Sequence, residues 1–107
     1  MLNISLQTNP ATAEYRLKMK GHCNTDVKGK DLVCAAASIL CVTMAETLKA
    51  NKKCLVKEPK VVIHDGKAVL EWQPKINYLI AMRISIDTVM NGFRELEKRY
   101  PEAIKIL

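Results

Sequence analysis

Hydrophobic residues in this chain recur with two different periods, and the order of these periods limits the possible folds more than any other feature. Apolar and polar residues alternate over residues 2–7 and again over 15–20, which is typical of strands with one exposed face. Residues 8–10, Thr-Asn-Pro, favour a turn between the two segments. The two segments are therefore expected to form a hairpin.

Two longer segments instead carry apolar residues at steps of three and four, which predicts helices over about 32–51 and about 77–99. Asp31 is suited to cap the first helix, and lysines near its far end favour the negative end of the helix dipole. Pro101 is expected to end the second helix.

The remaining segments favour strands. Residues 54–64 are rich in β-branched side chains but contain Pro59, which fits an edge position or a bulge. Asp65-Gly66 is a strong hairpin-turn signal and leads into a strand over 68–72. Residues 103–107 form a last short segment with β propensity.

The resulting order ββαββαβ predicts an α+β sandwich, in which a mainly antiparallel sheet is covered by two helices. The chain has 107 residues and no linker, internal repeat or low-complexity segment, so residues 1–107 are expected to form a single domain. Its 49% hydrophobic and 26% charged content is that of an ordinary soluble globular protein.

The sequence also bears on where the chain works. Its longest uncharged apolar runs are about ten residues, within 32–45, which is shorter than a bilayer span. Residues 1–7 lack the positive start and the continuous apolar stretch of a secretory signal. A cytoplasmic protein with no membrane partner is therefore expected.

Basic residues outnumber acidic ones, 17 to 11, which gives a formal net charge of +6. This balance suits proximity to the ribosome or to another RNA, but it is also common among soluble proteins. Aromatic residues make up 5% of the chain, so few side chains are available to stack on bases. No DNA partner is expected.

Four cysteines, Cys23, Cys34, Cys41 and Cys54, contain no CxxC pair of the kind that holds zinc. In a reducing cytosol they are expected to be free thiols. Cys41 lies on the apolar stripe of the first predicted helix and Cys54 lies between a helix and a strand, so both are expected to be structural. Neither a metal nor a cofactor is predicted.

The residues with the most reactive chemistry lie before and at the start of the first helix. If Asp31 caps the helix, Cys34 is its third residue, where free backbone N–H groups and the helix dipole favour a thiolate. His22 ends the preceding strand, and a loop bracketed by Gly21 and Gly29 returns the chain toward the helix. A Cys–His nucleophile pair is one interpretation. The other is a buried cysteine that packs, with three following alanines, against the sheet.

The string Gly-His-x₈-Asp-x₂-Cys-Ala-Ala-x-Ser, which begins at Gly21, resembles the signature of the ribosomal-processing cysteine proteases, the Prp family. The length and the order of elements match as well, so the resemblance covers essentially the whole chain. It implies a Cys–His dyad that removes a short N-terminal extension from a large-subunit ribosomal protein, cutting after an aromatic residue. It also implies a homodimer whose partner is a protein substrate with that cleavable extension.

The resemblance assigns roles to individual residues. It makes Cys34 the nucleophile and His22 the base that accepts the thiol proton. Asp31 and Ser38 match the acidic and hydroxyl positions of the motif. Asp31 then holds the helix start, or contacts His22 or the substrate. Ser38 bonds a backbone carbonyl, orients the site, or merely packs where a larger side chain does not fit.

The glycines of the motif suggest a moving loop. Gly21 and Gly29 bracket a segment whose counterpart in the family is mobile, which implies a lid that admits peptide. Cys23 departs from the family pattern, because the residue after the histidine is commonly alanine. This second thiol is inert, forms a reversible disulfide with Cys34, or marks a divergent branch, such as a prophage protease that acts on a capsid or scaffold protein.

Other interpretations are weaker. His64, which precedes the Asp65-Gly66 turn, is expected to be a solvated hairpin residue and not a ligand. A metal site made from His22, Cys23 and Cys34 lacks the paired short spacings of zinc sites. The sequence thus favours a cysteine endopeptidase, and its rival is a non-enzymatic ribosome- or RNA-associated module.

Overall fold

The computed structural model describes the backbone of residues 1–21, 30–64 and 66–107, and the side chains of these residues other than Lys30 and Asp31. The strands are β1 (Leu2–Asn9), β2 (Glu14–Lys20), β3 (Lys60–His64), β4 (Lys67–Trp72) and β5 (Ile104–Ile106). The helices are α1 (Lys30–Ala50) and α2 (Leu79–Arg99), and the short 3₁₀ helices are η1 (Lys52–Cys54) and η2 (Ile76–Tyr78).

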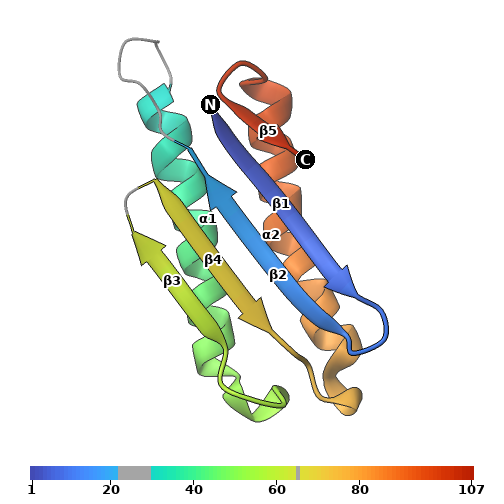
Figure 1. The fold of residues 1–107 in the computed structure, drawn as a ribbon. Helices are drawn as coiled ribbons and strands as arrows, with labels where there is room; N and C mark the ends of the chain where they lie inside the picture. The colour runs from blue at the N-terminus through green and yellow to red at the C-terminus, as the bar shows by residue number, and fades with distance from the viewer. Residues whose placement is uncertain (22–29, 65) are drawn as a thin grey trace.

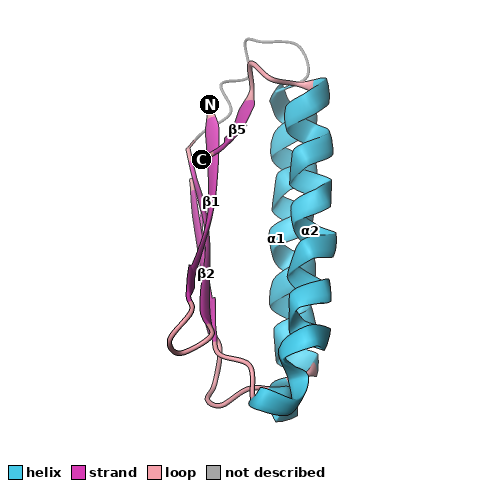
Figure 2. Ribbon diagram, turned by 90° about the vertical axis from the view of Figure 1, so that its right-hand side faces the viewer, coloured by secondary structure: helices cyan, strands magenta, loops and turns pink. Residues whose placement is uncertain are grey.

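The strands form one sheet with the spatial order β3-β4-β2-β1-β5 (Figure 1). All neighbouring pairs are antiparallel except β1 and β5, which are parallel. Both helices pack on the same face of this sheet, and no helix of the described residues lies on the other face (Figure 2). The predicted ββαββαβ order and the α+β sandwich are confirmed.

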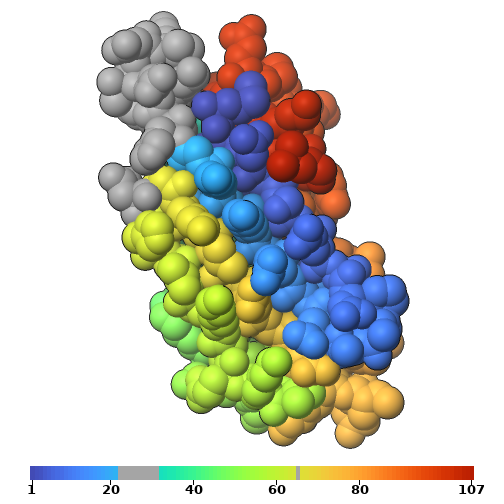
Figure 3. Space-filling view, in the orientation of Figure 1, coloured from blue at the N-terminus to red at the C-terminus, as the bar shows by residue number. Residues whose placement is uncertain are grey.

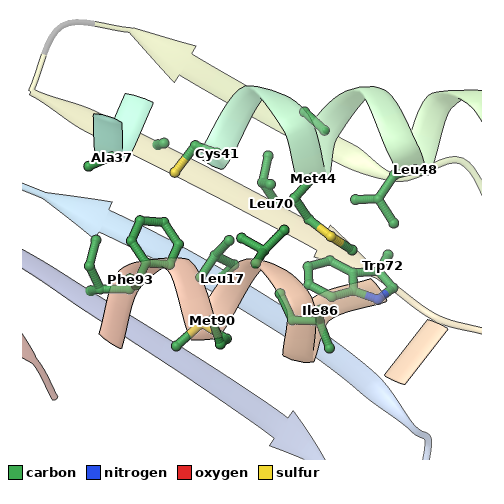
Figure 4. Packing of buried hydrophobic residues seen from close by; sticks show 14 of the residues in the cluster. Leu17, Ala37, Cys41, Met44, Leu48, Leu70, Trp72, Ile86, Met90 and Phe93 are labelled. Atoms are coloured by element: carbon green, nitrogen blue, oxygen red, sulfur yellow. The ribbon is translucent and has the colours of Figure 1, made fainter. Parts of the chain in front are cut away.

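The core lies between the sheet and the helices because each element presents one apolar face to the other layer. On the strands, every second residue belongs to this apolar face. Examples are Ile4, Leu17 and Leu70, which are all fully buried. The helices contribute their apolar stripes, including Met44 and Phe93 (Figure 4). The period-two and helical patterns of the sequence therefore meet in a single core.

The first hairpin extends further than predicted. β1 continues to Asn9, so the turn covers residues 10–13 and not 8–10. Asn9 closes the turn: its side-chain oxygen accepts from the Ala11 N–H at 3.1 Å, and its carbonyl accepts from the Ala13 N–H at 2.7 Å. These local bonds explain why a residue of high turn propensity ends a strand here.

The segment before β3 also differs from the prediction. β3 begins directly after Pro59, because proline cannot donate to a strand ladder. Leu55, which was placed in the same β-rich stretch, instead makes an isolated bridge with Pro74. Cys54 belongs to η1.

Helix α1 begins earlier than the sequence suggested. Its first residue is Lys30, so Asp31 is the second helical residue and the prediction that Asp31 caps the helix is wrong. The segment Leu32–Ala50 is long and apolar enough to cross a membrane by length and composition, contrary to our estimate from uncharged runs. Its apolar stripe, with Val33 and Leu48 fully buried, lies in the core.

The backbone conformation directly after β2 requires a glycine at position 21. Its φ is +127°, and a Cβ added there would lie 2.2 Å from the carbonyl oxygen of Met1. We expect Gly21→Ala to lower the free energy of unfolding by at least about 2 kcal/mol, because strain and a backbone clash act together. Urea denaturation measures this loss.

Gly92→Ala is the matched control. A Cβ on Gly92 would meet the flexible end of Leu40 at 2.7 Å and not a backbone atom, and Gly92 has no positive φ. Its cost should be clearly smaller, since Leu40 is able to shift and alanine favours the helix. Equal losses for the two variants would contradict the assigned constraint at Gly21.

Candidate active site

Gly21, the first residue of the motif, lies beside two other segments of the chain at one end of the sheet. The Gly21 N–H donates to the carbonyl of Gly66 in the β3–β4 turn at 3.1 Å, and Gly21 also lies against Met1. The beginning of α1 lies at this same end of the molecule (Figure 1). The chain thus leaves β2 for His22 at the end of the sheet where α1 begins.

Cys34 lies on α1 at the border between its buried and exposed faces. The residue is half-buried and packs against the core cluster, with Val33 fully buried beside it and Ala35 exposed. Because α1 begins at Lys30, Cys34 is the fifth helical residue and not the third. Its own N–H is therefore past the free N–H groups of the first turn, and the helix start favours the thiolate less than predicted.

Ser38 lies one turn further along α1 than Cys34 and is exposed. Its hydroxyl makes no hydrogen bond to any residue that the structure describes, unlike Thr43, which donates to the carbonyl of Ile39 at 2.6 Å. The exposure argues against the packing role considered for Ser38. Ser38 is thus exposed to solvent on the helix that carries Cys34.

The sulfur of Cys34 belongs to a disulfide bond in this structure. Cys41 and Cys54 are free thiols as expected, whereas the expectation of a free thiol is wrong for Cys34 in this structure; Cys23 lies outside the described residues. A disulfide sulfur does not act as the attacking group, because nucleophilic attack requires a thiolate. Cys34 must therefore be reduced before it serves as a nucleophile.

The other two described cysteines are structural, as predicted. Cys41 is fully buried, and burial raises the pKa of its thiol to about 11. Its Sγ lies 3.8 Å from the sulfur of Met19, which packs against the core. Cys54 is 6% exposed. Neither residue offers a reactive thiolate at the surface.

Several predicted site residues lie outside what the structure describes. These are His22 and Gly29, and of Asp31 only the backbone is described. The distance between His22 and Cys34 is accordingly still a prediction, as are the dyad and the lid. His64 is the last residue of β3 and is exposed, as expected for a hairpin residue.

Metal binding gains no support from the described part of the chain. Within residues 1–21, 30–64 and 66–107, no three His, Cys, Asp or Glu side chains come close enough to hold an ion. The alternative site of His22, Cys23 and Cys34 falls mostly outside these ranges.

Two open depressions lie at opposite ends of the molecule. One, of about 660 Å³, is formed by the β1–β2 hairpin and includes Tyr15 and Arg16, far along the strands from Gly21. The other, of about 630 Å³, is lined by Met1 together with residues of α2 and β5, including Glu97 and Lys105. Cys34 lines neither depression, so these two depressions do not mark the position of the candidate nucleophile.

Cysteine labelling tests the assignment of the nucleophile. After reduction and removal of the reductant, Cys34 should react with iodoacetamide faster than the other cysteines at neutral pH. Cys41 should be nearly inert, since a pKa of about 11 leaves about one thiolate in ten thousand at pH 7. Peptide mass mapping of timed samples measures the four rates, with urea-unfolded protein as the control. Equal labelling of all four in the folded chain would count against a special role for Cys34.

The fold and this residue together define a class: an α+β sandwich that presents a half-buried cysteine near the start of its first helix. The family model described as cysteine protease Prp matches residues 1–105. The chain belongs to this family and is a cysteine protease. No curated protein matches the sequence.

Solved structures share the fold over the whole chain. The Staphylococcus aureus ribosomal processing protease Prp, in complex with a substrate peptide, has a TM-score of 0.73 and 17% identity over 100% of this chain and 98% of its own. SMU.848 from Streptococcus mutans has a TM-score of 0.69 and 20% identity over 99% of this chain and 91% of its own. At such identities the likeness concerns the fold.

Proposed function

We propose that this chain is a cytoplasmic endopeptidase that removes a short N-terminal extension from a ribosomal protein precursor, with Cys34 as nucleophile and His22 as base. The observation that carries the proposal is the family match over residues 1–105, which includes the complete Gly-His to Cys-Ala-Ala-x-Ser string. The Staphylococcus aureus relative is described as a ribosomal processing protease and binds a substrate peptide.

The proposed reaction has two halves. His22 accepts the proton of the Cys34 thiol, and the thiolate attacks the scissile carbonyl while backbone N–H groups near the start of α1 stabilise the oxyanion. The tetrahedral intermediate collapses to a thioester, and His22 gives its proton to the leaving amine. Water, deprotonated by His22, then attacks the thioester, releases the carboxylate product and returns Cys34 to the thiol.

Partial burial of Cys34 suits this chemistry. A thiol fully enclosed like Cys41 has a raised pKa and no access to a peptide, whereas Cys34 is only partly buried on α1. A histidine at its side would offset the loss of helix-dipole support at the fifth position of α1, because an imidazolium favours the thiolate.

Mass spectrometry of candidate precursors tests the proposal. The reduced protein is incubated with ribosomal protein precursors that carry an N-terminal extension, and the products are searched for a new N-terminus that follows an aromatic residue. One defined cut that is absent without the enzyme supports the proposal. Cleavage of a capsid or scaffold protein in place of every ribosomal precursor would contradict the proposed substrate class while retaining the peptidase.

We also propose a homodimer formed through the outer face of α1. From Leu32 to Ala45 this helix has no charged residue, yet Leu32 is 59% exposed and Ile39 is 60% exposed. The outer face of α2, by contrast, carries ion pairs such as Arg83 with Asp87 at 3.0 Å. An uncharged helix face of this kind suits self-association by a two-fold contact.

Ile39→Glu should convert the dimer to a monomer, because it places a charge at the centre of the uncharged face. Ile84→Glu is the matched control, since Ile84 is 61% exposed on α2 and receives the same substitution. Size-exclusion chromatography with light scattering gives the mass of each variant. A monomeric wild-type protein, or a dimer that Ile84→Glu disrupts equally, would contradict the proposed interface.

A further inference from the structure

The sheet face that turns away from both helices carries lysines in register. We call this surface the open sheet face; Figure 3 views it directly, with no helix in front. It is formed by the alternate strand residues that do not enter the core. Its charged members are Glu14, Arg16, Lys18, Lys20, Lys60, Lys67, Glu71 and Lys105, and His64 lies on the same face.

One row of this face crosses all the strands at the end where α1 begins. His64 of β3 pairs with Lys67 of β4, and Lys67 pairs with Lys20 of β2. Lys20 pairs with Asn3 of β1, which in turn pairs with Lys105 of β5. Directly opposite residues lie about 5 Å apart between strands. The row therefore concentrates positive charge across the width of the sheet.

The acidic residues of the open sheet face leave these lysines without ion pairs. Glu71 binds Arg16 at 2.7 Å, and Glu14 lies 3.8 Å from Lys57. Within the described chain, no acidic group lies within ion-pair distance of the remaining lysines, which are Lys18, Lys20, Lys60, Lys67 and Lys105. The basic charge of this surface is thus available to a ligand.

This arrangement has a cost for folding. Like charges on directly opposite residues, such as Lys20 and Lys67, destabilise an antiparallel pair. Neutral polar residues would serve a solvent-facing sheet better, as Ser5 and Gln7 do on the neighbouring strand. A bound anionic partner gives the repeated lysines a function that offsets this cost.

We propose that the open sheet face binds the phosphate backbone of double-helical RNA. Along β2, Lys18 and Lys20 lie two residues apart, about 7 Å, so that successive groups of a polyanion are within reach. The face has no Phe, Tyr or Trp among its outward positions, which favours backbone contacts over stacking on unpaired bases.

The shape of the surface favours RNA over DNA. The DNA major groove admits a helix or a two-stranded ribbon, and the five-stranded open sheet face is broader than either, whereas the minor groove of A-form RNA is wide and shallow and displays 2′-hydroxyls. Asn3, Ser5 and Gln7 line the outer side of β1 beside the lysines of β2, and such side chains hydrogen-bond to hydroxyls. This inference does not depend on the proposed peptidase reaction.

The test compares two triple variants with equal loss of charge. Lys18→Gln/Lys20→Gln/Lys67→Gln removes the centre of the open sheet face. The control, Lys49→Gln/Lys53→Gln/Lys75→Gln, alters exposed lysines of α1, η1 and the segment before η2, none of which belongs to a strand of the sheet. Fluorescence anisotropy with a labelled RNA duplex of about two helical turns is recorded between about 50 and 200 mM salt.

The wild-type protein should bind with a steep salt dependence. The first variant should lose at least about tenfold in affinity, and its slope of log K against log salt should fall by about 1 for each lysine removed. The control should change little. Thermal melting shows that both variants are folded, and removal of the Lys20–Lys67 repulsion should not lower the melting temperature.

Three results would overturn the inference. Equal losses in both variants would show a general charge effect. Equal affinity for a DNA duplex of the same sequence would remove the argument for RNA. Competition by polyglutamate as effective as that by unlabelled RNA would assign the surface to an acidic protein segment.

Discussion

Replacing Cys34 by serine is expected to lower the rate of precursor cleavage at least about 10³-fold, in assays where both proteins are kept reduced. A serine hydroxyl titrates far above neutral pH, and a lone histidine generates little alkoxide from it. The two side chains differ little in volume, and Cys34 is half-buried, so the fold should persist. The variant should still bind uncut precursor and act as a substrate trap.

The control for this experiment is Cys54→Ala, which removes a free thiol elsewhere in the chain. It should retain the wild-type cleavage rate, although the loss of a buried sulfur lowers stability somewhat. Circular dichroism and thermal melting establish that each variant is folded. Cleavage by folded Cys34→Ser at the wild-type rate would end the assignment of Cys34 as nucleophile.

Replacing His22 by alanine is expected to be nearly as damaging, because the Cys34 thiol would lose the group that accepts its proton. The double variant His22→Ala/Cys34→Ser should be hardly slower than either single variant, since residues that act as a unit have losses that do not add. Steady-state cleavage of one precursor by the three variants gives the comparison.

The chain offers a direct control in its other histidine, His64, which is exposed at the end of β3. His64→Ala should leave cleavage unchanged. Multiplicative losses in the double variant, or an equal effect of His64→Ala, would contradict a His22–Cys34 dyad while leaving the peptidase open to another base.

The order of elements could be predicted from the sequence because two hydrophobic periods mark the two layers. The ends of the strands and helices could not be predicted, because they depend on local hydrogen bonds and on tertiary contacts. Asn9 closes its turn with its own side chain and so extends β1. Helix α1 begins at Lys30, before the residue with the best capping chemistry, and this moves Cys34 into the second turn.

The motif singles out Cys34 as the candidate nucleophile, but it does not predict how exposed the Cys34 side chain is. Spacing alone could not tell a half-buried thiol from a fully buried one such as Cys41, because both occur on the same helix. The open sheet face was missed for a related reason. Lys20, Lys67 and Lys105 are far apart in the sequence, and only the strand register brings them into one row.

Strand β5 gives the protein a particular order of folding during synthesis. One edge of β1 pairs with β2 within the first hairpin. The other edge pairs with β5, which lies about 100 residues later in the chain, so this pairing forms late. The Leu2 N–H then donates to Ala103 at 2.9 Å, and the Leu107 N–H donates to Ile4 at 2.8 Å. Until these bonds form, a growing chain carries an unpaired strand edge that invites pairing with other chains. Completion of the sheet therefore requires β5, and the peptidase should become fully folded only once residues 104–106 have left the ribosome.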